Sequence, residues 1–123
     1  MTAAGVVILY KLYKLYKLYK LNLMIILGLD PGIAKLGYAL IEKTERKTRF
    51  IKCDLISTSN KLPKLERFKQ LKLNLTTIIL EYQPEIVALE KIMFFKNEKT
   101  VIEVAQVIGL IISLIGDYQI KLL

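Results

Sequence analysis

The segment "MIILGLDPGIAKLGYALIE", residues 24–42, contains a short apolar strand, a turn and a second apolar strand. Residues 25–29 are wholly apolar, which is typical of a strand that is covered on both faces of a sheet. The strand ends at Asp30, and Asp-Pro-Gly is itself a common turn sequence. Two interpretations of Asp30 therefore stand side by side: it makes the turn, or it is a carboxylate held at the strand end for chemistry.

The pattern of apolar residues predicts the remaining elements. Three consecutive strands come first, and two later strands are each reached through a helix. Right-handed crossovers would make the first, fourth and fifth strands neighbours. The order predicts an α/β fold, with a mixed five-stranded sheet and flanking helices. The expected elements are strands at 25–29, 36–43, 49–57, 85–90 and 118–123, and helices at 63–82 and 98–115, the second capped by Asn97 and ended by Gly116.

Composition limits the chemistry. The 123 residues are 54% hydrophobic, which suits one packed domain. The chain has one cysteine, Cys53, and no histidine, so a disulfide within the chain, Cys/His zinc sites and Ser-His or Cys-His catalytic pairs are excluded. A reducing cytoplasm is the expected setting. Since no apolar stretch reaches the roughly 18 to 20 residues of a membrane helix, no membrane partner is expected.

The first 23 residues differ from the rest. Residues 10–21 repeat the tripeptide Tyr-Lys-Leu, whose period matches neither a helix nor a strand. Residues 1–23 are therefore predicted to be a low-complexity leader outside the fold, and 24–123 to be the domain; a basic membrane-surface helix is the alternative. The net charge of +8 falls to +4 without the leader, a mild basic bias that is compatible with a polyanionic partner.

Two acids end apolar strands. Asp30 closes the first strand and Glu90 closes the fourth, so parallel neighbouring strands would bring both carboxylates to one carboxyl edge. Oxygen ligands of this kind suit magnesium. The alternatives are a simple turn at Asp30 and a surface ion pair between Glu90 and Lys91. Other acids fit the edge less well, since Asp54 lies within a strand.

The segments "IILGLDPGIAKLGYALIE", "PEIVALEKIMFFKNEKT" and "VAQVIG" resemble the RuvC family of Holliday-junction resolvases, which have a ribonuclease H-like fold. The resemblance covers residues 24–123. It implies a crossover junction endodeoxyribonuclease that works as a homodimer and nicks four-way DNA junctions in recombination and repair with two magnesium ions per site. Asp30 and Glu90 match two of the family's four acidic metal ligands. A branch-migration helicase is a further partner that the resemblance implies.

The chain departs from the family pattern at its end. The family's other two acids lie in a helical segment beyond the fifth strand, whereas this sequence stops at "YQIKLL". The expectation is a ribonuclease H-like domain without its C-terminal helices and with impaired cleavage.

The loop after Glu90 carries three large apolar residues and then basic and amide groups. We expect it to meet DNA bases and phosphates, with the family's base-stacking residue at or near Met93. Alternatively, a phenylalanine folds back onto the core. The predicted DNA-binding residues are Met93, Phe94, Phe95, Lys96, Asn97 and Lys99.

The helix at 98–115 is apolar almost all the way round, although a helix that covers a sheet needs only an apolar stripe. A subunit interface through Val101, Ile108 and Ile112 would bury the second side. Cover from a missing C-terminal segment is the alternative.

Two other functions remain open. The chain could be a non-catalytic DNA-binding or dimerising remnant. It could also be an actin-like nucleotide-binding lobe with "LDPGIAKLG" as its phosphate loop, although such proteins need a second lobe with another phosphate loop.

Overall fold

The computed structural model describes residues 2–21, 23–90 and 98–123. Its elements in chain order are α1 (Ala3–Leu21), β1 (Met24–Asp30), β2 (Lys35–Lys43), β3 (Thr48–Ser57), α2 (Lys64–Tyr82), β4 (Ile86–Leu89), α3 (Glu98–Asp117) and β5 (Lys121–Leu122). Every strand and helix predicted between residues 24 and 123 is present, with boundaries shifted by up to three residues.

The strands form one sheet in the order β3-β2-β1-β4-β5. β1 pairs antiparallel with β2, and β2 pairs antiparallel with β3. β4 pairs in parallel with β1 on one side and with β5 on the other. The predicted α/β fold and the predicted adjacency of the first, fourth and fifth strands are therefore confirmed.

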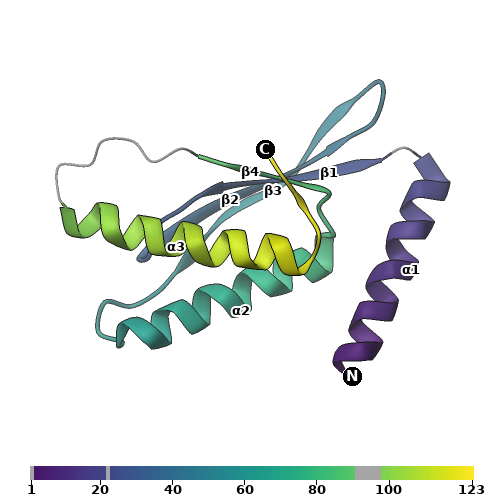
Figure 1. Ribbon diagram of the computed structural model, residues 1–123. Helices are drawn as coiled ribbons and strands as arrows, with labels where there is room; N and C mark the ends of the chain where they lie inside the picture. Colours follow the sequence, from purple (N-terminus) through teal and green to yellow (C-terminus); the bar gives the residue numbers. More distant parts are fainter. Residues whose placement is uncertain (1, 22, 91–97) are drawn as a thin grey trace.

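The core lies between one face of the sheet and the helices α2 and α3 (Figure 1). Alternate residues of β1, namely Ile25, Leu27 and Leu29, are buried on that face, while the residues between them are only half-buried. Cover on both faces, as predicted for this strand, is thus not seen among the described residues. Both crossover helices lie on the same side of the sheet, which leaves the other face without a helix in the described part of the chain.

The helix ends have local causes. α2 stops where Gln83 takes a left-handed conformation (φ 53°) and its N–H donates to the carbonyl oxygen of Ile79, with Pro84 following. α3 continues through Gly116, the predicted end, to Asp117. The Tyr118 N–H still donates to the Leu114 carbonyl oxygen, so the turn extends and β5 begins later than predicted. Asn97, the predicted cap, lies outside the described residues.

The repeat segment is helical. α1 includes nearly all of the first 21 residues, so the expectation that its period fits no helix was wrong. Leu and Lys are good helix formers, and a helix does not need an apolar stripe to form when its residues favour it. Its contact with the rest of the chain includes Tyr10, whose hydroxyl donates to the Tyr118 carbonyl oxygen at 2.8 Å. The division into a leader and a domain stays a prediction.

α3 is long and apolar enough to cross a membrane, judged by its length and composition alone. This corrects the expectation that no such stretch exists, because Glu103 and Gln106 do not interrupt the helix. Core helices of globular proteins pass the same test, and α3 contributes five buried residues to the core: Val104, Val107, Ile111, Leu114 and Ile115.

Candidate functional site

Asp30 is the last residue of β1, and its side chain is exposed. In the antiparallel pair with β2 it lies opposite Gly37. A Cβ atom at Gly37 would lie 3.5 Å from the Asp30 Cβ and 3.9 Å from its Oδ2. An added Cβ atom at this position would therefore make ordinary van der Waals contact with the Asp30 side chain.

Glu90 follows the last residue of β4. The parallel register pairs Leu29 with Leu89, so the residues that follow them, Asp30 and Glu90, leave the sheet side by side. The Glu90 N–H continues the ladder by donating to the Leu29 carbonyl oxygen at 3.2 Å. The two acids therefore lie together at one carboxyl edge of the sheet, as the strand order predicted.

The two carboxyl groups interact. The pKa of Glu90 is raised, chiefly by a hydrogen bond with the Asp30 side chain and by the charge of Asp30. Two exposed carboxyl groups this close together are a favourable place for a divalent cation with oxygen ligands. In the part of the chain that the structure describes, no group of three or more acids, cysteines or histidines gathers that could hold a metal ion. Asp30 and Glu90 thus offer two ligands for one ion.

Basic side chains lie at the same edge of the sheet. Lys35 opens β2 beside the turn that follows Asp30, and Lys64 opens α2 after β3 has ended at this edge. Both are exposed, as is Lys61 in the preceding loop. α3 also begins at this end of the molecule, and Lys99 in its first turn is exposed (Figure 1). This arrangement suits a polyanion that approaches the two acids.

Most of the predicted DNA-contacting loop lies outside the described residues, including Met93, Phe94, Phe95, Lys96 and Asn97.

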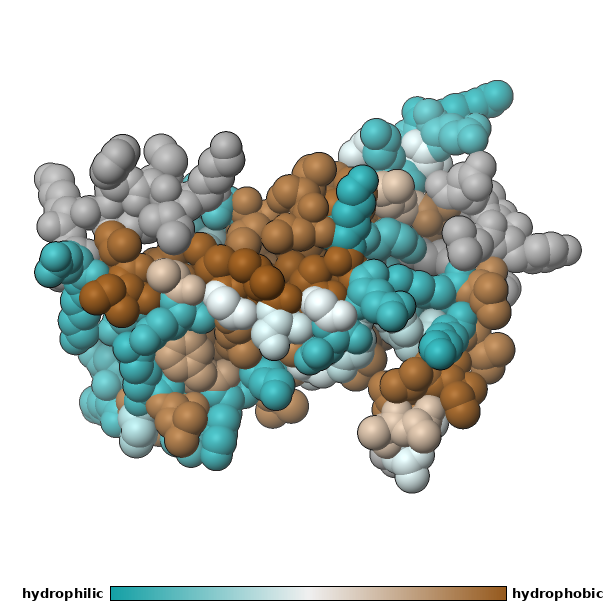
Figure 2. Space-filling model, viewed as in Figure 1, coloured by the Kyte–Doolittle hydropathy of each residue, from teal (hydrophilic) through white to brown (hydrophobic). Residues whose placement is uncertain are grey.

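The outer side of α3 is apolar and partly uncovered. Of the predicted interface residues, Ile112 is 48% exposed, and Val101 and Ile108 are half-buried. Ile102 on the same helix is also exposed. Figure 2 shows apolar side chains gathered in a band along α3.

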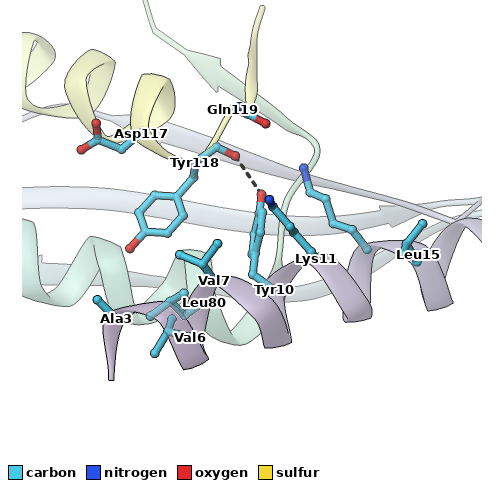
Figure 3. Close-up of a pocket in the computed structure, with 11 residues that line it drawn as sticks. Ala3, Val6, Val7, Tyr10, Lys11, Leu15, Leu80, Asp117, Tyr118 and Gln119 are labelled. Carbon is cyan, nitrogen blue, oxygen red and sulfur yellow. Dashed lines mark hydrogen bonds between the residues drawn. The ribbon is translucent and has the colours of Figure 1, made fainter. Parts of the chain in front are cut away.

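A groove lies at the opposite end of the sheet from the two acids. It has a volume of about 800 Å³ and lies between α1 and the ends of α2 and α3. Tyr10 and Tyr118 meet edge to face there, with ring centroids 5.9 Å apart, and Val6, Val7 and Leu80 line the groove (Figure 3). Because it flanks the amino ends of the parallel strands, the groove is separate from Asp30 and Glu90.

Two residues that hold the turn after Asp30 were missed by the sequence analysis. Thr58 and Arg67 give no sequence signal, because a threonine after a strand and an arginine early in a helix usually face water. Here Thr58 is buried and bonded to the loop after Asp30.

The comparisons with known proteins agree with this geometry. The family model described as "Crossover junction endodeoxyribonuclease RuvC" matches residues 26–122. The curated RuvC of Halothermothrix orenii is 43% identical over 99 residues, which cover 80% of this chain and 60% of that protein. The RuvC of Caldicellulosiruptor saccharolyticus is 43% identical over 90 residues, covering 72% and 54%.

Among solved structures, T. thermophilus RuvC in complex with Holliday junction substrate matches with a TM-score of 0.74 at 24% identity. The match covers 80% of this chain and 62% of that one. The fowlpox virus Holliday junction resolvase has a TM-score of 0.56 at 22% identity, with 81% and 59% covered. These two structural similarities show a shared fold. The chain spans about 60% of the length of its curated relatives.

Proposed function

The chain belongs to the RuvC family of crossover junction endodeoxyribonucleases, and we propose that it is the sheet-forming part of a magnesium-dependent nuclease that nicks four-way DNA junctions in recombination and repair. The observation that carries this proposal is the meeting of Asp30 and Glu90 at the carboxyl ends of two parallel strands. The proposed reaction is inferred from the family, and the proposed active site is inferred from the position of the acid pair.

Magnesium is the proposed ion, because the donors are hard carboxylate oxygens at a solvated edge. Asp30 and Glu90 would hold it. An ion held there would supply activation of water and stabilisation of the leaving oxygen of a phosphodiester, chemistry for which two ions about 4 Å apart are typical. Two carboxylates are too few to hold two ions. We therefore propose that these 123 residues bind magnesium weakly and cleave close to background, and that the family's two further acids complete the site.

The proposed substrate is branched double-stranded DNA. The exposed lysines at the edge that carries the acids, Lys35, Lys61, Lys64 and Lys99, support contact with phosphates, which does not require base recognition. The loop with Met93, Phe94 and Phe95 is proposed to meet bases, as the family resemblance implies.

We also propose a homodimer through α3. Its exposed Ile102 and Ile112 support this interface, since apolar area of this kind is seldom left in water. A two-fold pair of acid sites would suit symmetric nicking of a junction. A branch-migration helicase stays a prediction from the family resemblance, and a cytoplasmic setting stays a prediction from the cysteine content.

A non-catalytic DNA-binding or dimerising remnant is the second candidate, supported by the finding that no group of three or more metal-ligating side chains gathers among the residues that the structure describes. The nucleotide-binding alternative is not retained, because the family model that matches residues 26–122 is that of a nuclease.

A chimera tests the proposal. The part of the H. orenii relative that follows the matched region is fused after residue 123, and nicking of a labelled four-way junction is measured with magnesium. We expect cleavage in the chimera, its loss in Asp30→Asn and Glu90→Gln, and junction binding in all three proteins.

Asp54→Asn is the matched control, because Asp54 lies within β3; it should cleave like the unmodified chimera. Junction binding without cleavage in the chimera would favour the remnant. Strong magnesium-dependent cleavage by the 123-residue chain would refute the argument from two ligands.

A further inference from the structure

The turn after Asp30 is tightly constrained. Asp30 is held in β1 opposite Gly37, and three residues later the Ile33 side chain is buried, with 7% of its surface exposed. Between them, Pro31 has a fixed φ angle. Gly32 packs so closely on the Lys35 carbonyl group that a Cβ atom would clash with it. Contacts that fix Ile33 therefore also restrict the conformation of the backbone between Asp30 and Ile33.

Thr58 holds this turn at two successive carbonyl groups. Its hydroxyl donates to the Ile33 carbonyl oxygen at 2.5 Å, and its backbone N–H donates to the Ala34 carbonyl oxygen at 2.9 Å. Thr58 is only 8% exposed. A buried hydroxyl without partners would be costly, so these bonds stabilise the turn in one conformation.

Arg67 fixes the direction of the Thr58 hydroxyl. Its Nε–H donates to the Thr58 Oγ1 at 2.9 Å. Since arginine can only donate, the hydroxyl accepts from Arg67 and directs its own proton to the Ile33 carbonyl oxygen. Arg67 itself lies in the first turn of α2, where its backbone N–H donates to the Pro63 carbonyl oxygen. Three segments that are distant in sequence are joined in this way.

We propose that Thr58 and Arg67 are positioning residues: they form a brace that fixes the turn after β1 and so aims the Asp30 carboxylate toward Glu90. This inference rests on the proposed role of Asp30 as a metal ligand, and its structural half, the fixed turn, can be tested without that role.

The test uses Mn²⁺ as the probe ion and the full 123-residue chain. Thr58→Val keeps the shape but removes the hydroxyl, whereas Thr58→Ser keeps the hydroxyl. Amide hydrogen exchange over residues 32–35 reports the turn, and Mn²⁺ titration followed by electron paramagnetic resonance reports the acids. We expect faster exchange and about tenfold weaker Mn²⁺ binding in Thr58→Val, as for other groups that orient a ligand, and near-parent values in Thr58→Ser.

Further variants separate positioning from stability. Arg67→Met should show the same changes if Thr58→Val fails to fold, while Arg49→Met, in the β2–β3 hairpin and paired with Glu42, should not. Leu114→Ala, which destabilises the core away from the turn, should leave Mn²⁺ affinity unchanged in the folded protein.

The outcomes distinguish the two proposals. If Asp30→Asn leaves Mn²⁺ binding unchanged, the proposed metal site fails, and parent-like exchange in Thr58→Val would still refute the fixed turn. If Mn²⁺ binding requires Asp30 but both Thr58→Val and Arg67→Met retain parent affinity, the brace does not position Asp30 and the inference is overturned.

Discussion

The backbone N–H of Glu90 donates a hydrogen bond to the carbonyl oxygen of Leu29 at 3.2 Å, one residue past the end of β4. This bond extends the parallel ladder to the very edge of the sheet, so that Glu90 must stand beside Asp30. The fold thus forces two negative charges together. A hydrogen bond with the Asp30 side chain and, after it, the negative charge of Asp30 raise the pKa of Glu90.

The first prediction concerns pH. Because the pKa of Glu90 is raised in the folded chain, the folded state holds more protons than the unfolded state between the ordinary and the raised pKa. The free energy of unfolding should therefore fall as pH rises through that window. Glu90→Gln removes the repulsion, so its melting temperature should exceed that of the parent above the window and match it in acid. Since Glu90 is exposed, the rise in melting temperature of Glu90→Gln over the parent should be small.

Melting temperatures from pH 3 to 8 without divalent ions test this prediction. Glu81→Gln controls for the loss of one negative charge, because Glu81 lies on α2. Magnesium added at neutral pH should stabilise the parent and have little effect on Glu90→Gln. A parent that is as stable as Glu90→Gln at every pH would show that the two carboxylates do not oppose folding.

The sheet and the acid pair could be predicted because they depend on local patterns. Apolar runs mark β1 and β4, and each is followed at once by an acid, so strand order alone brings Asp30 and Glu90 together. Thr58 and Arg67 could not be found, because their partners lie 25 and 9 positions away and only the folded chain brings them into contact. α1 was missed because the three-residue period of the Tyr-Lys-Leu repeat was taken to exclude a helix.

Self-association through α3 gives the second prediction. The 123-residue chain should form a dimer at tens of micromolar, and Ile112→Lys should make it monomeric by placing a charge on the exposed apolar band. Ile112 is a cleaner position than Ile108, which is half-buried and would also affect folding. Sedimentation velocity measures the mass.

Leu73→Lys is the matched control, because Leu73 is 68% exposed on α2 and lies outside that band. It should remain dimeric. If the unmodified chain is monomeric at high concentration, the proposed dimer interface on α3 is wrong.

The third prediction concerns α1. Tyr10→Phe removes the hydroxyl that donates to the Tyr118 carbonyl oxygen but keeps the ring contact. Such a bond contributes about 0.5–1.5 kcal/mol, so the melting temperature should fall by no more than several degrees.

Deleting residues 1–23 should lower the melting temperature only slightly more than Tyr10→Phe does, if the leader is not part of the fold. Leu12→Ala, at an exposed position of α1, is the control; a fall of tens of degrees on deletion would make α1 part of the domain.

The last prediction concerns the sheet face that α2 and α3 do not cover. Ala88 lies opposite Gly28 on that face, near its centre, and is half-buried. Because Cys53 is the chain's single cysteine, Cys53→Ser followed by Ala88→Cys places one thiol at this point. We expect this thiol to react readily with a maleimide in the 123-residue chain, and to be protected in the chimera with the C-terminal part of the H. orenii relative, since buried thiols react slowly. Leu73→Cys in the same Cys53→Ser background should react equally in both proteins. Equal reactivity of the Ala88→Cys thiol in the two chains would mean that the added segment leaves this face open, and the two further acids would then have to reach Asp30 and Glu90 by another route.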